Sequence, residues 1–205
     1  MIPFAANAIQ VSHGKNSKNL NIICQKPKNI HANRASKKIE SFLRIYKNSI
    51  VKSHLNRIVL CGHLKRYNLD WIRGTYNIKN KTIWLEVDDH KDVLFILHHE
   101  FSSLLMHNYK KINANQWIKH NNGDYIKSWQ KQKWDWQPND TLRRNGFLYS
   151  YSQQSLEDDF NVMSALYLAG VPSYSRMLKD ASKFHRIKEK LNIVKRYYKE
   201  ILIAH

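Results

Sequence analysis

The sequence predicts an α+β domain in which a small β-sheet packs against apolar helices. Hydrophobic residues make up 42% of the 205 residues and aromatic residues 12%, which is the composition of a folded globular protein. Short apolar runs with strand character occur at 57–61, 74–78 and 82–87. Apolar residues at helical spacing dominate the C-terminal half. Strands followed by helices are typical of the α+β class.

Residues 1–33 are expected to form an irregular arm, because Asn, Lys, Ser and Gly outnumber apolar residues from position 9 to position 33. Residues 34–205 are expected to form a single domain. Within it, apolar side chains at helical spacing predict an amphipathic helix from Asn33 to about Leu55. The runs 74–78 and 82–87 flank three polar residues, which predicts a β-hairpin.

Three more helices are predicted after the hairpin. The helix at 93–109 follows Asp88 and Asp89 as capping residues and is apolar on most sides, which predicts burial. A second buried helix is expected at 156–168, and a final helical region at about 175–203. The residues between the helices at 93–109 and 156–168 are rich in Trp and Lys. A long segment of this kind is typical of the wall or lid of a functional site, although each Trp could equally cover the core.

Basic residues strongly outnumber acidic ones, with 34 Lys and Arg against 16 Asp and Glu and a net charge of +18. Such a surface attracts polyanions, so anionic lipid, acidic cell-wall polymers and nucleic acid are candidate partners. The alternative is that the charge only serves solubility. Nucleic acid is the weakest candidate, because no recognised nucleic-acid motif occurs. No apolar stretch reaches the length of a transmembrane helix.

The cysteine pair and the first residues bear on localisation. Cys24 and Cys61 can form one disulfide, which would tie the arm to the strand at 57–61, or can remain two free thiols. Ala6-Asn7-Ala8 has the small-x-small form of a signal-peptidase site. Together these features predict a secreted or periplasmic protein with a Cys24–Cys61 disulfide.

The chemically informative segment is His98-His99-Glu100, within the predicted helix at 93–109. In an H-E-x-x-H helix, histidines four residues apart bind zinc and the Glu activates a water molecule. His99 and Glu100 match the first two positions, but Ser103 stands where the second His is required, and a hydroxyl is a poor zinc ligand. His98 points about 100° away from His99 and would need a distorted helix to share a metal ion. The alternative is that the histidines are core residues.

Any further metal ligand must come from elsewhere in the chain, and the start of the helix at 156–168 offers three consecutive acids. Glu157 is the expected ligand, with Asn161 one turn later orienting it; Asp158 and Asp159 are the alternatives. The simpler interpretation is that these acids only stabilise the positive end of the helix dipole.

The order of these motifs resembles bacterial zinc metallopeptidases of the gluzincin kind, many of which are exported. The resemblance runs loosely from Asn33 to Tyr198 and rests on Gly74-Thr75-Tyr76, Thr82-Ile83-Trp84-Leu85, His98-His99-Glu100-Phe101, the segment 145–151 and Glu157-Asp158-Asp159-Phe160. It implies a zincin-like fold, with a sheet edge strand along the cleft, an active-site helix and a later helix that gives a glutamate ligand. Carried over, it makes His99 and Glu157 zinc ligands and Glu100 the general base.

Two functions follow from these observations. The first is a zinc-dependent metallopeptidase-like hydrolase with an atypical metal site, acting on a peptide or protein substrate. The second is a catalytically inactive protein of the same fold that binds an acidic polymer, an anionic surface or a protein partner. Ser103 is the residue that divides them, since it puts both zinc binding and catalysis in doubt.

Overall fold

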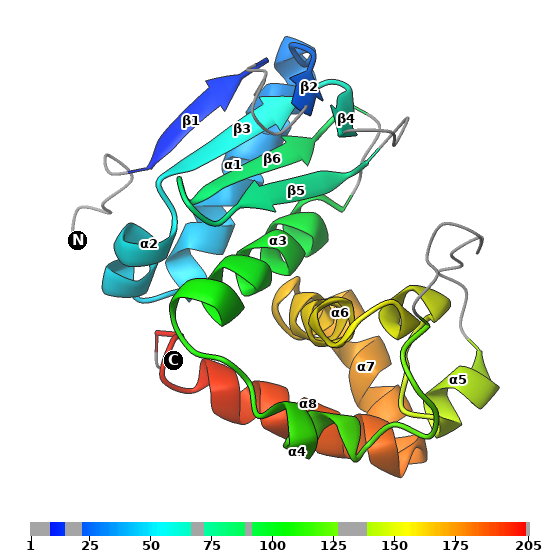
Figure 1. Ribbon diagram of the computed structural model, residues 1–205. Helices are drawn as coiled ribbons and strands as arrows, with labels where there is room; N and C mark the ends of the chain where they lie inside the picture. The colour runs from blue at the N-terminus through cyan, green and yellow to red at the C-terminus, as the bar shows by residue number, and fades with distance from the viewer. Residues whose placement is uncertain (1–8, 15–21, 67–71, 89–91, 127–138, 204–205) are drawn as a thin grey trace. The chain divides into compact units, whose positions relative to one another are not determined.

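The computed structural model describes residues 9–14, 22–66, 72–88, 92–126 and 139–203. The chain packs as two compact units, one of Met1–Lys110 with Ile201–His205 and one of Lys111–Glu200. The first unit contains all the described strands and the second is helical (Figure 1). The predicted α+β class, with a small sheet and a helix-rich C-terminal half, is confirmed.

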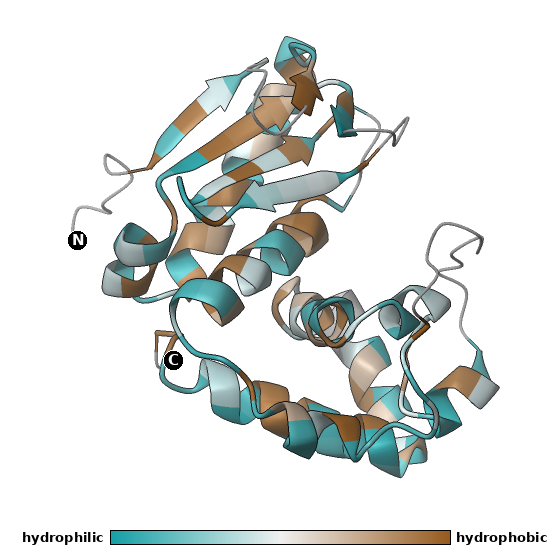
Figure 2. Cartoon of the chain, viewed as in Figure 1, coloured by the Kyte–Doolittle hydropathy of each residue, from teal (hydrophilic) through white to brown (hydrophobic). Residues whose placement is uncertain are grey.

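The sheet of the first unit has four strands in the order β1-β3-β6-β5. Their bounds are β1 Gln10–His13, β3 Arg57–Cys61, β6 Thr82–Glu86 and β5 Gly74–Asn77. β1, β3 and β6 run parallel, whereas β5 is antiparallel to β6 in the predicted hairpin. Figure 2 shows apolar residues along β3 and β6, the central strands, which are buried over most of their length. β5 is therefore an outer strand of the described sheet.

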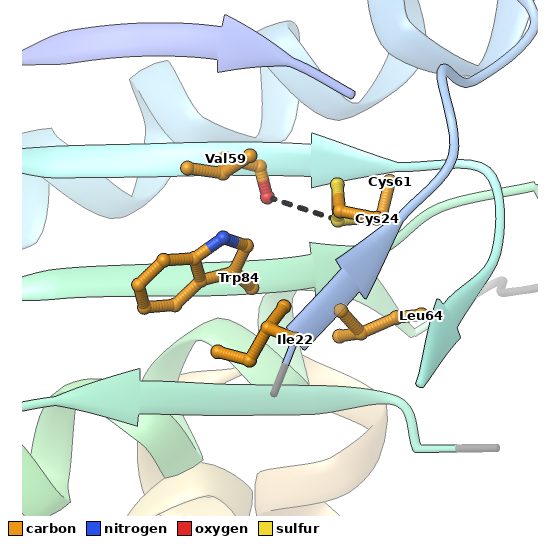
Figure 3. Packing of buried hydrophobic residues seen from close by; sticks show 6 residues of the cluster. All are labelled: Ile22, Cys24, Val59, Cys61, Leu64 and Trp84. Atoms are coloured by element: carbon orange, nitrogen blue, oxygen red, sulfur yellow. Dashed lines mark hydrogen bonds between the residues drawn. A yellow bond between two sulfur atoms is a disulfide. The ribbon is translucent and has the colours of Figure 1, made fainter. Parts of the chain in front are cut away.

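The N-terminal arm is less irregular than its composition predicted. It contains β1 and also β2 (Ile22–Cys24), which pairs antiparallel with β4 (Leu64–Arg66) in a second, two-stranded sheet. The predicted Cys24–Cys61 disulfide is confirmed and joins the two sheets. Both cysteines belong to a buried cluster drawn in Figure 3, whose members are Ile22, Cys24, Val59, Cys61, Leu64 and Trp84.

The predicted helix at 33–55 is two helices, α1 (Asn29–Ile45) and α2 (Asn48–His54). Tyr46 leaves the helix because its backbone forms a β-bridge with Leu202, and Lys47 N–H donates to the Ile201 carbonyl at 3.0 Å. This partner lies more than 150 residues away, so local periodicity could not reveal the break.

The third helix of this unit, α3, spans Val93–Asn108 and is buried on most sides, as predicted. Its expected capping by Asp88 is wrong. Asp88 instead accepts a hydrogen bond from the Lys28 backbone N–H at 3.1 Å and contacts His31 Nδ1 at 3.0 Å, both at the start of α1. Asp88 therefore stabilises the N-terminus of α1, where a negative charge is favourable.

The second unit is built from five helices and a short 3-10 turn. They are α4 (Ala114–Ile118), α5 (Asp140–Arg144), η4 (Ser150–Gln153), α6 (Leu156–Leu168), α7 (Val171–Lys183) and α8 (His185–Tyr198). The bounds of α6 agree with the prediction, whereas the region predicted at 175–203 is divided at Phe184, which is extended. In the part of the chain that the structure describes, no helix is both long and apolar enough to cross a bilayer.

Candidate active site

The outer strand β5 lies along α3 (Figure 1). A Cβ atom at Gly74 would be 2.6 Å from Ile96 Cγ2 and 2.8 Å from Glu100 Oε1, closer than side chains pack. Further along, the Tyr76 hydroxyl lies 3.4 Å from Nε2 of His107. Only glycine therefore leaves room for the Glu100 carboxyl group beside this strand.

The face of α3 that meets β5 includes the position of the missing histidine. Ile96, Glu100 and His107 all contact β5 and are separated by four or seven residues, so they share one side of the helix. Ser103 lies three residues after Glu100 and four residues before His107, a spacing that places it on the same side of the helix. Its side chain is 1% exposed. The residue in place of the second zinc-binding His is thus a small, buried hydroxyl group.

His99 and Glu100, the predicted zinc ligand and general base, are almost completely buried on α3. Their exposed fractions are 8% and 9%. The ring of His99 lies beside Phe95, one turn earlier, with 6.4 Å between ring centroids. Local sequence accounts for this placement, because the apolar residues around the pair make α3 a buried helix.

His98 has the surroundings of a core histidine. Its ring is completely buried, its Nδ1 atom lies 2.8 Å from the Tyr46 hydroxyl, and its centroid is 5.1 Å from that of Phe42. Burial lowers the pKa of His98 to about 3, so the ring is neutral at physiological pH. These contacts correspond to the core interpretation of the histidine pair that the sequence left open. Ligation of a metal by His98 stays a prediction.

The three acids at the start of α6 have different surroundings. Asp158 accepts hydrogen bonds from the Ser155 hydroxyl at 2.7 Å and the Tyr151 hydroxyl at 3.1 Å, while Ser155 caps the helix through the Asp158 N–H. Burial raises the pKa of Asp158. Glu157 is half-buried in the first turn. Ser155 thus caps α6 and Asp158 bonds back to it in the first turn, the position where the simpler interpretation expected acids to favour the helix dipole.

Asp159 is held in a buried ion pair with Lys190, which sequence reasoning missed. One carboxylate oxygen, Oδ2, accepts hydrogen bonds from Lys190 Nζ at 2.6 Å, Trp117 Nε1 at 2.8 Å and the Tyr125 hydroxyl at 3.0 Å. Burial raises the pKa of Asp159 and lowers the pKa of Lys190. A lysine among the apolar residues of the last predicted helix was the signal that could have pointed to this pair. Asp159 is therefore part of the internal structure of the second unit.

The predicted meeting of His99 with Glu157 joins residues of different units. His99 belongs to Met1–Lys110, and Glu157 belongs to Lys111–Glu200. Within each unit the structure fixes the surroundings of these residues as described above. The shared site stays a prediction.

A family model described as "putative zinc-binding metallo-peptidase" matches residues 63–202, which is more than half of the chain and includes α3 and α6. The chain belongs to this family. The resemblance to zinc metallopeptidases that the sequence motifs indicated is thereby confirmed.

The fold of this family member is similar to a crystal structure of a putative zinc-binding metallo-peptidase from Bacteroides caccae ATCC 43185. The TM-score is 0.62 at 14% sequence identity, over 94% of this chain and 79% of the other. At this identity the likeness establishes a common fold. No match is found among curated proteins.

On α3, this family member offers one histidine where an H-E-x-x-H helix offers two. Catalytic zinc sites have three protein ligands from His, Cys, Asp or Glu. On α3, His99 has the position of the first ligand, but Ser103 lacks a ligand atom of the usual kind, so the remaining ligands would have to come from other positions. Among the described residues, no group of three or more His, Cys, Asp and Glu side chains is arranged to hold a metal ion.

Proposed function

We propose that this chain is a non-catalytic member of the metallo-peptidase family that binds an extended acidic peptide along β5. The observation that carries this proposal is Ser103, buried on the β5 side of α3 where the family helix needs its second histidine. A hydroxyl group there removes one of the two histidine ligands that an H-E-x-x-H helix gives to zinc. Without a firmly held metal, no water molecule is activated for hydrolysis.

The peptide-binding part of the proposal rests on the position of β5. It is an outer strand, and no other described strand pairs with its free edge. Such an edge presents backbone N–H and C=O groups to which an extended peptide can add as a further strand. Two exposed cations, Arg73 and Lys79, flank β5, and the chain carries a net charge of +18. These charges favour an acidic peptide or polymer over a basic one.

The disulfide supports an oxidising location for this function. Disulfides persist in secreted and periplasmic proteins and are rare in the cytosol. The Cys24–Cys61 bond therefore favours the secreted or periplasmic location that the sequence indicated.

A zinc-dependent hydrolase is the second candidate function. The family description favours it, and so does Glu100, whose carboxyl group is kept beside β5 by a glycine that leaves it room. In this case His99 and Glu157 would be zinc ligands and Glu100 would be the general base.

One experiment separates the two candidates. Wild type, Glu100→Gln and the control Glu40→Gln, at an exposed position on α1, are incubated with zinc and a fluorescent acidic peptide. The proposal expects peptide binding without cleavage in all three proteins. Cleavage by wild type and by Glu40→Gln that is lost in Glu100→Gln would establish the hydrolase instead.

The binding surface has its own test. Replacing both Arg73 and Lys79 by Gln should weaken acidic-peptide binding roughly tenfold, because two flanking charges are removed. The matched control is Lys188→Gln with Lys199→Gln, which removes the same charge from exposed positions at α8. Equal weakening in both double variants would mean that net charge alone attracts the peptide, and would contradict binding along β5.

A further inference from the structure

The end of β2 and the start of α1 carry the two most exposed large aliphatic side chains that the structure describes. Ile23 is 53% exposed and Ile30 is 56% exposed, and these are the highest values among the large hydrophobic side chains that the structure describes. Exposed aliphatic residues are common singly, but these two lie within eight residues of sequence, and we call residues 23–30 the tip.

Cations surround this tip. Lys26 and Lys28 lie between the two isoleucines and are exposed, and Arg34 is exposed one helical turn after Ile30. Lys65 lies directly opposite Ile23 in the β2–β4 pair, so their side chains share the outward face of that sheet. No acidic residue occurs in the sequence from Ile22 to Lys38.

The tip is held rigidly by the sheets behind it. Cys24 is bonded to Cys61, and backbone hydrogen bonds join Gln25 N–H to the His63 carbonyl at 3.0 Å and Gly62 N–H to the Gln25 carbonyl at 2.9 Å. Asp88, the nearby acid, is engaged with the Lys28 backbone N–H and with His31. Ile23 alternates with two buried neighbours on its strand, so it cannot turn inward without disrupting the buried cluster.

We propose that the β2–α1 segment docks this protein on an anionic bilayer. Aliphatic side chains enter the headgroup region while lysines and arginines remain at the level of the lipid phosphates. A nucleic-acid site would instead present aromatic or arginine side chains for stacking on bases. The combination of isoleucine with lysine on one tip therefore fits lipid better than a soluble polyanion, and this docking is independent of events at β5.

The test is co-sedimentation of the whole chain with vesicles. Wild type should sediment with vesicles made of equal parts phosphatidylcholine and phosphatidylglycerol and far less with phosphatidylcholine alone. Lys26→Gln with Lys28→Gln should lower the partition coefficient about twenty-fivefold, since each lysine near an anionic surface contributes about fivefold. Ile23→Ser with Ile30→Ser should lower it about tenfold, because apolar area no longer leaves water.

The control is again Lys188→Gln with Lys199→Gln, which should change partitioning less than about threefold because these residues lie outside the proposed contact. Thermal melts of every variant confirm that it is folded. A wild type that stays in solution would overturn the proposal. So would an Ile23→Ser, Ile30→Ser variant that sediments like wild type, because binding would then depend on charge alone.

Discussion

Adjacent histidines on α3 lie in different surroundings because each residue of a helix is rotated by about 100° from the previous one. His98 is completely buried, with its Nδ1 atom at the Tyr46 hydroxyl, whereas His99 keeps a small exposed fraction beside Phe95. The two imidazoles are therefore not interchangeable. His98 belongs to the packing of the first unit, and His99 is the residue that the family motif would use.

His98 should make the first unit less stable at acidic pH. Its pKa is 6.5 in the unfolded chain and about 3 in the folded protein, so below pH 6.5 the unfolded state binds a proton that the folded state does not. The contribution of neutral His98 to the free energy of unfolding is complete above pH 6.5. It is lost as the pH falls toward 3, by up to about 1.4 kcal/mol per pH unit. Urea unfolding at pH 7.5 and pH 5 should show this loss in wild type.

The matched variants for this prediction are His98→Phe, which keeps an aromatic ring, and His107→Asn, which removes an exposed histidine. Between pH 7.5 and pH 5, the free energy of unfolding should fall less in His98→Phe than in wild type. In His107→Asn it should fall as much as in wild type. An unchanged pH dependence in His98→Phe would show that another group is responsible.

At the scale of elements, three links between distant residues hold helices and strands in place. Asp88 caps α1, the disulfide joins the two sheets, and Lys190 on α8 binds Asp159 on α6. Each link joins residues more than 30 positions apart. Local sequence patterns could predict the elements but not these connections between them.

The disulfide should contribute substantially to the stability of the first unit. Its cysteines are 37 residues apart, and closing a loop of this length in the unfolded chain corresponds to about 4 kcal/mol in the chain-entropy model. Reduction, or Cys24→Ala with Cys61→Ala, should lower the free energy of unfolding by roughly 3–4 kcal/mol. Urea unfolding with and without a reductant measures this difference. A shift below about 1 kcal/mol would argue against a disulfide in the folded protein.

The buried Lys190–Asp159 pair should be far more sensitive to substitution than an exposed pair. Lys190→Met removes the cation and leaves a buried carboxylate, which should lower the free energy of unfolding by roughly 3–5 kcal/mol. Lys183→Met, which breaks the exposed pair with Asp140, should lower it far less, because solvent screens this pair. Thermal or urea unfolding of the two variants compares them directly. Equal effects would mean that Lys190 is not paired inside the folded protein.

At the scale of the whole molecule, the sequence predicted the elements whose signals are local. The hairpin, α3 and α6 follow from alternation and apolar periodicity. The break at Tyr46 and the strand β1 that pairs with β3 depend on partners elsewhere in the chain. Their composition is ordinary for a helix or a loop, so no local rule could have revealed them.

In the candidate site, too, local signals could be predicted from the sequence and contacts between distant residues could not. His99, Glu100 and Ser103 could be placed on one helix from spacing alone, and the family match confirms the resemblance that they suggested. The room that Gly74 leaves for Glu100 requires a strand to lie beside α3, which the sequence does not specify. The chain is thus a member of this family in which Ser103 stands where the H-E-x-x-H pattern has its second histidine.

The zinc content of purified wild type and Ser103→His, after saturation with zinc and dialysis, tests the central claim most directly. Elemental analysis should find well under one zinc per wild-type chain, because Ser103 cannot act as a ligand beside His99. Ser103→His should approach one zinc per chain, since it completes the H-E-x-x-H spacing, and its melting temperature should rise when zinc is added. One zinc per chain in wild type, lost on His99→Ala, would contradict the account.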